Sequence, residues 1–200
     1  MIIHHNIEQN TEDWHNLRMG KFTASMFKDC FAAKSTAAYK NAINDVVFQI
    51  LTGEVEESYS NAIMQRGHEI EPLAADYYEL LTFSEVKEAG FWEYNEFIGA
   101  SPDRLVNDDG ILEIKSPKGT TLIELYETMK LPTVYYWQVH GQLMCTGRQW
   151  CDFISFHPSL KPIIIRIERD EAVIKELETK LFECVEIVKQ KVELIKSLNL

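Results

Sequence analysis

The chain has 200 residues and a mass of 23.2 kDa, and 46% of its residues are hydrophobic and 26% charged. This is the composition of an ordinary soluble globular protein. No apolar run approaches the roughly 18 residues of a membrane span, and the N-terminus lacks the basic start and apolar stretch of a secretory signal. The four cysteines form no C-x-x-C pair, so we expect reduced thiols in a cytoplasmic protein.

The net charge of -11 argues against non-specific coating of nucleic acid, because such binding depends on Lys and Arg neutralising phosphates. The acid is concentrated, however, since residues 61–110 carry 3 basic and 11 acidic side chains. Some of these carboxylates could be metal ligands, and bound cations would offset part of their charge. We expect the others to face solvent.

The first elements of the chain are predicted to be helical. Residues 12–51 read as helices broken by short turns, and Thr23 or Ser25 could cap one of them. Residues 62–81 carry apolar side chains at three- and four-residue spacing, which predicts an amphipathic helix with a kink or restart caused by Pro72.

The period then changes to that of strands. Residues 89–93, 97–106 and 110–116 are predicted strands, and the Asn-Asp-Asp-Gly sequence at 107–110 predicts a hairpin turn between the last two.

The remaining predicted elements are two helices, two strands and a closing helix. Residues 120–129 and 133–145 are predicted helices, 150–157 and 162–168 are predicted strands, and Asp170 is the predicted N-cap of a closing helix. The apolar stripe of that helix is Val173, Leu177, Leu181, Cys184, Val188, Val192 and Ile195.

This order predicts an α/β fold of the α+β type, with a mixed central β-sheet flanked by helices. The sequence has no G-x-G-x-x-G or Walker loop, so a doubly wound nucleotide-binding fold is not expected. We expect one domain over residues 1–200, with a helical part at 1–60, a core at 61–170 and the closing helix at 171–200.

Asp103, Glu113 and Lys115 form the most informative cluster. Glu113 and Lys115 leave the same face of a predicted strand because they are two residues apart. A hairpin with an even loop would turn Asp103 to the other face, so we predict a three-residue loop, or a bulge at Gly110, that places Asp103 opposite Glu113.

Two carboxylates about 4 Å apart repel by roughly 4 kcal/mol at an effective dielectric constant of 20, so this pair needs a cation. Oxygen ligands suit Mg²⁺ or Mn²⁺, and such an ion can activate water and stabilise charge on a phosphoryl group. Lys115 could orient or deprotonate that water, or neutralise the transition state. The alternative without catalysis is that Asp103, Glu113 and Lys115 lie on a solvated strand face. Glu71 would then be an ordinary residue of a helix surface.

These residues together resemble the phage lambda exonuclease family, the YqaJ-type viral recombinase nucleases of the PD-(D/E)xK superfamily. The resemblance runs from about residue 14 to 170. In chain order its blocks are Trp14-His15-x-Leu17-Arg18-x-Gly20-x-x-Thr23-Ala24-Ser25, Arg66-Gly67-x-x-x-Glu71, Ser101-Pro102-Asp103, Leu112-Glu113-Ile114-Lys115-Ser116-Pro117, Gln138 in Tyr136-Trp137-Gln138-Val139, and Ile167-Glu168-Arg169-Asp170-Glu171.

The resemblance implies a restriction-endonuclease-like core and roles for individual residues. The implied metal ligands are Asp103, Glu113, the backbone carbonyl of Ile114, and Glu71, for one or two Mg²⁺ ions, with Mn²⁺ as an alternative. Lys115 is the implied catalytic lysine.

Further residues match the family around this centre. Gln138 matches a helix glutamine that places the water or the lysine. Arg18, Ser25 and Ser101 match the family's receptor for a 5′-phosphate, chemistry that an Arg fork and hydroxyl donors suit. Taken alone, Arg18 would be a surface ion-pair partner and Gln138 an ordinary polar residue of a helix.

The sequence also departs from the family pattern. Arg104 stands where the family usually has glycine, beside the metal site, where it could grip phosphate or change how DNA approaches. A further acidic position could be Glu93 or Glu96, and spacing does not decide between them. We expect no catalytic part for His68 or His140, since a carboxylate-rich magnesium site does not need imidazole.

The aromatic residues near Gln138 are expected in the core rather than in a base-stacking platform. These are Tyr135, Tyr136 and Trp137. Trp14 is an exception, because the family places its segment near the DNA end. The cysteines lack the pattern of the related nucleases that hold an iron–sulfur cluster.

The resemblance implies a metal-dependent exonuclease that degrades linear double-stranded DNA 5′→3′ from phosphorylated ends in phage-type recombination. It further implies a homotrimer and a single-strand annealing partner, in the cytoplasm of a bacterial host. Two alternatives remain open: an endonuclease with the same metal centre, and an inactive DNA-binding or interaction module. For the exonuclease, we expect a basic lining that includes Arg18, Lys115 and Arg104 to bind the DNA end, while the rest of the protein surface is acidic.

Overall fold

The computed structural model describes residues 1–55 and 62–198. The side chains of Arg66 and His68, both singled out in the sequence, lie outside the described residues. The helices are α1 (Glu12–Arg18), the 3-10 turn η1 (Ala24–Met26), α2 (Phe27–Cys30), α3 (Ala37–Thr52), α4 (Ala62–Thr82), α5 (Gly119–Thr128), α6 (Thr133–Thr146) and α7 (Glu171–Ser197).

The strands of the described residues form two sheets. One has the order β1 (Ile2–His4), β4 (Phe91–Asn95), β5 (Ile98–Ala100), β2 (Phe22–Thr23). The other has the order β3 (Val86–Glu88), β6 (Arg104–Val106), β7 (Gly110–Lys115), β8 (Trp150–His157), β9 (Leu160–Glu168). The pairs β2–β5 and β7–β8 are parallel and the others antiparallel. The predicted mixed α+β class is therefore confirmed.

Residues 97–106, predicted as one strand, are divided between the two sheets. β5 ends at Ala100 and β6 begins at Arg104, so the Ser101-Pro102-Asp103 segment crosses from one sheet to the other. Pro102 has no backbone N–H to give to a ladder, which suits a break at this point. The segment therefore lies where the two sheets meet.

Several predicted elements agree closely with the structure, and the errors are in short segments. The strand at 150–157 and the helices at α4, α5 and α6 are found where expected. β1, β2 and β3 were not predicted, and the helical interpretation of residues 22–23 is wrong, because Phe22 and Thr23 pair with β5. Strands of two or three residues are too short to show a period.

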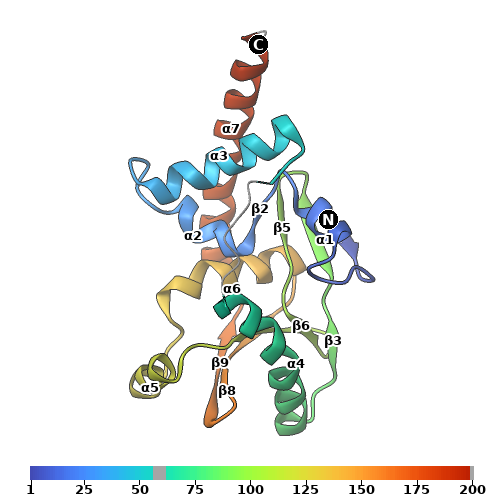
Figure 1. Ribbon diagram of the computed structural model, residues 1–200, viewed down its shortest axis with the longest axis vertical. Helices are drawn as coiled ribbons and strands as arrows, with labels where there is room; N and C mark the ends of the chain where they lie inside the picture. Colours follow the sequence, from blue (N-terminus) through green and yellow to red (C-terminus); the bar gives the residue numbers. More distant parts are fainter. Residues whose placement is uncertain (56–61, 199–200) are drawn as a thin grey trace.

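The closing helix α7 begins as predicted, since the Asp170 side chain accepts hydrogen bonds from Ala172 N and Val173 N. Its buried face differs at both ends, because Ile174 rather than Val173 is buried and Ile195 is 38% exposed. The C-terminal turns of α7 project beyond the rest of the molecule (Figure 1), which agrees with the exposure of Leu194 and Ile195 there.

Three apolar clusters hold the layers together. The largest joins α2, α3, α6 and α7 to the first sheet, a second packs α4 against β7 and β8, and a third packs α5 against β8 and β9 (Figure 1). Helix α4 is also fixed by a buried polar contact, in which Tyr78 Oη donates to Asp152 Oδ2 at 2.6 Å while Arg166 donates to both oxygens of Asp152. This contact sets the position of the helix that carries Glu71.

None of the helices in the described part of the chain is long and apolar enough to span a membrane.

Candidate metal centre and phosphate-binding cluster

The hairpin β6–β7 has the register that the sequence predicted. Val106 pairs with Gly110 across a three-residue loop, and Arg104 pairs with Leu112. One more step of this register places Asp103 opposite Glu113. The residue with positive φ is Asn107 (46°) rather than Gly110, so the three-residue loop is confirmed and the glycine bulge is not needed. Gly110 is required by packing instead, since a Cβ there would lie 2.2 Å from the Trp150 ring.

The carboxylate of Asp103 is hydrogen-bonded to the neighbouring strand β7. Its Oδ2 accepts a hydrogen bond of 2.6 Å from the backbone N–H of Ile114. This contact holds the Asp103 carboxylate beside the strand that carries Glu113 and Lys115.

Glu113 is fully buried and receives three side-chain donors. Oε1 accepts from Gln138 Nε2 at 2.6 Å and from the ammonium of Lys115, and Oε2 accepts from Gln142 Nε2 at 2.5 Å. Lys115 therefore lies on the Glu113 face, as the two-residue spacing predicted. Gln138 thus contacts the carboxylate that also binds Lys115, and its implied role in placing the water or the lysine stays a prediction.

Gln142 is a site residue that the sequence analysis missed. It is buried, and it lies one helical turn beyond Gln138 on α6. Residues four apart on a helix share a face, so the repeat of glutamine at this spacing was a signal that could have revealed it.

The electrostatics of this centre favour a bound cation. Burial and the nearby charge of Glu113 raise the pKa of Asp103 well above its ordinary value, against the lowering effect of Lys115. Burial acts to lower the pKa of Lys115, but the charges of Glu113 and Asp103 outweigh it, and the pKa of the lysine is raised. Lys115 is therefore an ammonium near neutral pH, and alone it leaves the pair of carboxylates short of positive charge.

The donor atoms present fit a hard divalent ion. Mg²⁺ is commonly held in proteins by one or two carboxylates while it keeps several waters, and Asp103 and Glu113 offer such a pair. Among residues 1–55 and 62–198, no three His, Cys, Asp or Glu side chains form a group that could hold a metal. Glu71 is thus not gathered with the other two carboxylates, although its charge contributes to the raised pKa of Asp103.

Glu71 is instead paired with Arg104. Arg104 Nη1 lies 2.7 Å from Glu71 Oε1 and donates to the Asp103 carbonyl at 2.5 Å, while Nη2 lies 3.4 Å from Glu88 Oε1. Arg104 is only 9% exposed. The guanidinium that the sequence placed as a possible grip on phosphate is therefore occupied by carboxylates.

A second cluster surrounds Arg18, next to the Ser101-Pro102-Asp103 segment. The Arg18 guanidinium lies 4.0 Å from the centre of the Trp14 ring and donates to Thr23 Oγ1 at 3.2 Å. Trp14 Nε1 donates to Ser101 Oγ at 2.9 Å. Burial lowers the pKa of Arg18 to about 10, so the group stays charged at neutral pH in a poorly hydrated place. Thr23, which the sequence placed in the same motif block and as a possible helix cap, is also a member of this cluster.

The structure brings Arg18 and Ser101 into this cluster through Trp14, whereas Ser25 is exposed on η1. Glu93 is paired with His4 at 2.7 Å and Lys21 at 3.6 Å, and Glu96 is exposed in the β4–β5 turn.

The neighbours of Gln138 are held by ring contacts. Trp137 stacks on Phe31 with centroids 3.6 Å apart, and Tyr136 lies 4.6 Å from the His140 ring. His140 is buried, and burial lowers its pKa. The ring of Tyr135 contacts Phe153, with Lys115 Nζ 5.3 Å from its centroid.

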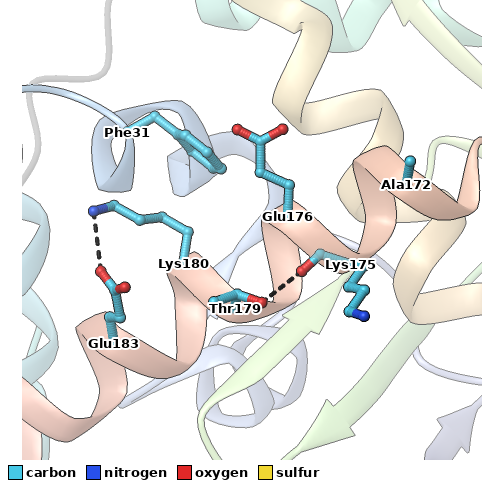
Figure 2. A pocket seen from close by; sticks show the side chains of 7 residues that line it. All are labelled: Phe31, Ala172, Lys175, Glu176, Thr179, Lys180 and Glu183. Atoms are coloured by element: carbon cyan, nitrogen blue, oxygen red, sulfur yellow. Dashed lines mark hydrogen bonds and ion pairs between the residues drawn. The ribbon is translucent and has the colours of Figure 1, made fainter.

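A pocket of about 570 Å³ lies elsewhere, between Phe31 and α7, and shares no lining residue with either cluster. Figure 2 shows its charged side chains, of which Lys180 and Glu183 are paired at 3.2 Å. The chemistry-bearing groups are thus those around Glu113 and Arg18.

The chain is similar to solved structures of exonucleases. The chain is 39% identical to the alkaline exonuclease LHK-Exo from Laribacter hongkongensis, with a TM-score of 0.88 over 94% of this chain and 98% of that one. The complex of LHK-Exo with dAMP matches over the same shares with a TM-score of 0.89. A phage-related exonuclease from Haemophilus somnus 129PT, at 17% identity and a TM-score of 0.67 over 90% of this chain and 98% of that one, shares the fold.

The chain belongs to the family of YqaJ-like viral recombinase domains, which match it over residues 13–149. Curated proteins gave no match. The resemblance inferred from the motifs is confirmed.

Proposed function

We propose that the protein is a divalent-metal-dependent nuclease that removes nucleotides 5′→3′ from linear double-stranded DNA with a 5′-phosphate. The observation that carries this proposal is the Asp103 carboxylate held at Ile114 beside the fully buried Glu113, with Lys115 bonded to Glu113, next to the Arg18–Trp14–Ser101 cluster. The likeness to an alkaline exonuclease at 39% identity supports the same activity.

Asp103 and Glu113 hold the divalent ion, with the Ile114 carbonyl as a further donor, and Mg²⁺ is the expected ion. Bound there, the ion supplies an activated water and positive charge for the scissile phosphate. Gln138 and Gln142 fix the Glu113 carboxylate, so that its oxygens keep their orientation during the reaction.

Lys115 brings its ammonium to Glu113, beside the proposed ion. Without metal, Glu113 and Asp103 raise its pKa, whereas a bound cation would offset their charges. At that place the lysine either neutralises charge on the phosphoryl oxygens or orients or deprotonates the attacking water.

Arg18 and Ser101 receive the terminal 5′-phosphate. A guanidinium lying on Trp14 and poorly hydrated offers charge-assisted hydrogen bonds at little cost in desolvation. Ser101 is two residues from Asp103, so the terminal phosphate would lie near the scissile phosphate. We therefore propose that the enzyme releases single nucleotides.

The wider setting follows from the family. We infer a homotrimer, a single-strand annealing partner and a role in phage-type recombination in the cytoplasm of a bacterial host. An endonuclease with the same centre is the competing function, because the metal centre itself does not select DNA ends.

The test compares three substrates in Mg²⁺: linear duplex with a 5′-phosphate, linear duplex with a 5′-hydroxyl, and closed circular duplex. We expect fastest release of mononucleotides from the phosphorylated linear DNA and none from the circle. Cleavage of the circle would favour an endonuclease. Absence of hydrolysis from all three would contradict the nuclease itself.

A further inference from the structure

A pocket of about 500 Å³ opens beside Lys115, between the α5–α6 connection and β8. Its lining includes Leu125, Leu131, Phe153 and Tyr135, together with Lys115 from the candidate metal centre. Most of the lining is apolar, and its volume suits a small organic ligand. The functions assigned above leave this pocket without a role.

The pocket and the Arg18 cluster lie on opposite sides of the metal centre. The strand order β6-β7-β8 places Ser101 and Asp103 on the β6 side, Glu113 and Lys115 on the central strand β7, and the pocket residues Phe153 and Ser155 on β8. Lys115 and Ser155 are direct partners in the β7–β8 ladder. A strand that crosses from Arg18 over the metal centre therefore reaches this pocket next.

The chemistry of the pocket fits a nucleobase. The ammonium of Lys115 lies over the Tyr135 ring, 5.3 Å from its centroid, and the Phe153 ring contacts Tyr135, so two aromatic side chains and a cation line the same pocket. Bases stack on aromatic side chains without regard to sequence, because every base has a π-face. Lys130 and Glu124 also line the pocket, so its charges sum to one positive charge with Lys115.

We propose that this pocket receives the base of the second nucleotide, the one on the 3′ side of the scissile phosphate, after it leaves its stacked position in the duplex. The proposal rests on the proposed function, which places the terminal nucleotide at Arg18 and the scissile phosphate between Asp103 and Lys115. A base is joined to its phosphate by one sugar, so the base next to Lys115 has this apolar surface within reach.

The test removes the base rather than the pocket. Linear duplexes with a 5′-phosphate carry one abasic residue at nucleotide 2 or at nucleotide 4, and the rate of releasing nucleotide 1 is measured in a single turnover. Loss of a stacked base should slow release at least about fivefold for the nucleotide 2 substrate. The nucleotide 4 substrate should react like intact DNA. Equal rates for the two abasic substrates would overturn the proposal while leaving the nuclease intact.

Two matched variants locate the effect. Tyr135→Leu keeps an apolar contact with Phe153 but removes the ring, so it should slow intact DNA about fivefold and hardly change the rate on the nucleotide 2 abasic substrate. Tyr136→Leu is the control, because Tyr136 faces Trp137 and His140 instead. If Tyr135→Leu slowed both substrates equally, the base would not lie on that ring.

A binding measurement keeps the proposal testable without hydrolysis. Fluorescence anisotropy on the Asp103→Asn variant compares the same labelled duplexes. At least about fivefold weaker binding of the nucleotide 2 abasic duplex than of the nucleotide 4 duplex is expected. Equal affinities would overturn the pocket assignment, whereas failure of the wild type to hydrolyse any DNA would overturn the proposed function.

Discussion

Arg104 Nη1 lies 2.7 Å from Glu71 Oε1, and this ion pair ties helix α4 to the hairpin that carries the candidate metal ligands. Both side chains are largely shielded from water, with 11% and 23% of their surfaces exposed. Family resemblance assigns the Glu71 carboxylate to the metal, but in this structure the guanidinium of Arg104 is its partner. Arg104 therefore supplies at Glu71 the positive charge that a metal ion would otherwise supply.

Removing that charge should change metal binding. In Arg104→Ala the Glu71 carboxylate loses its partner and becomes available to a cation near Asp103, so we expect Mn²⁺ to bind severalfold more tightly in isothermal titration. The variant should also be less stable by about 2 kcal/mol, because breaking a shielded pair leaves one charge uncompensated.

The control for this prediction is the double variant Arg104→Ala, Glu71→Gln, in which no carboxylate is released. Its Mn²⁺ affinity should return to the wild-type value. Unchanged affinity in the Arg104→Ala single variant would show that Glu71 does not reach the metal.

Gln142 should matter as much as Gln138, although only Gln138 belongs to a recognised motif. In Gln142→Leu the fully buried Glu113 Oε2 loses its donor, which should cost about 1–3 kcal/mol of unfolding free energy and reduce nuclease activity. Urea unfolding and a single-turnover assay measure the two effects. Wild-type behaviour in both would mean that Gln142 does not support the Glu113 carboxylate.

The stability of the metal-free protein should fall as the pH rises from 5 to 8. The pKa of Asp103 is raised by burial and by Glu113, so the folded state holds this proton at pH values where the unfolded state has lost it. Unfolding then releases a proton, and its free energy decreases with pH through this window. The raised pKa of Lys115 adds no slope here, because that ammonium is protonated in both states.

Thermal unfolding between pH 5 and pH 8, with and without Mg²⁺, measures this effect. Mg²⁺ should raise the Tm more at pH 8 than at pH 5, since it binds the deprotonated carboxylate. Asp103→Asn should flatten the pH dependence and remove the Mg²⁺ effect. The slope of Tm against pH in metal-free Asp103→Asn is subtracted from the slope in the metal-free wild type. A positive difference would contradict the raised pKa of Asp103.

Arg18 should determine the preference for phosphorylated ends. Loss of a charge-assisted hydrogen bond costs about 1.5–3 kcal/mol, so Arg18→Ala should lower kcat/KM on 5′-phosphorylated DNA by about 10- to 100-fold. The value on 5′-hydroxyl DNA should change little. Ser25→Ala is a second test, because Ser25 also matches the family's phosphate receptor and is exposed on η1, so it should lower the value on 5′-phosphorylated DNA in the same direction. Equal losses on both substrates would remove Arg18 from the phosphate site.

The register of the hairpin was predictable because alternation along a strand is strict: Asp103 and Glu113 share a face only across an odd loop. Gln138 and Lys115 followed from motifs and spacing within one element. The pairing of Arg104 with Glu71 did not, since it joins residues 33 positions apart on different elements. The division of residues 97–106 between two sheets was also hidden, because each part is a strand of only three residues.

The most direct test of the account is the rate of mononucleotide release from 5′-phosphorylated linear duplex in saturating Mg²⁺, compared among the wild type, Asp103→Asn and Lys115→Ala. We expect Mg²⁺-dependent release by the wild type and a loss of at least about 100-fold in each variant, since one variant removes a metal ligand and the other removes the charge at the phosphate. Folded variants that degrade the DNA at the wild-type rate would contradict the metal centre proposed for this protein.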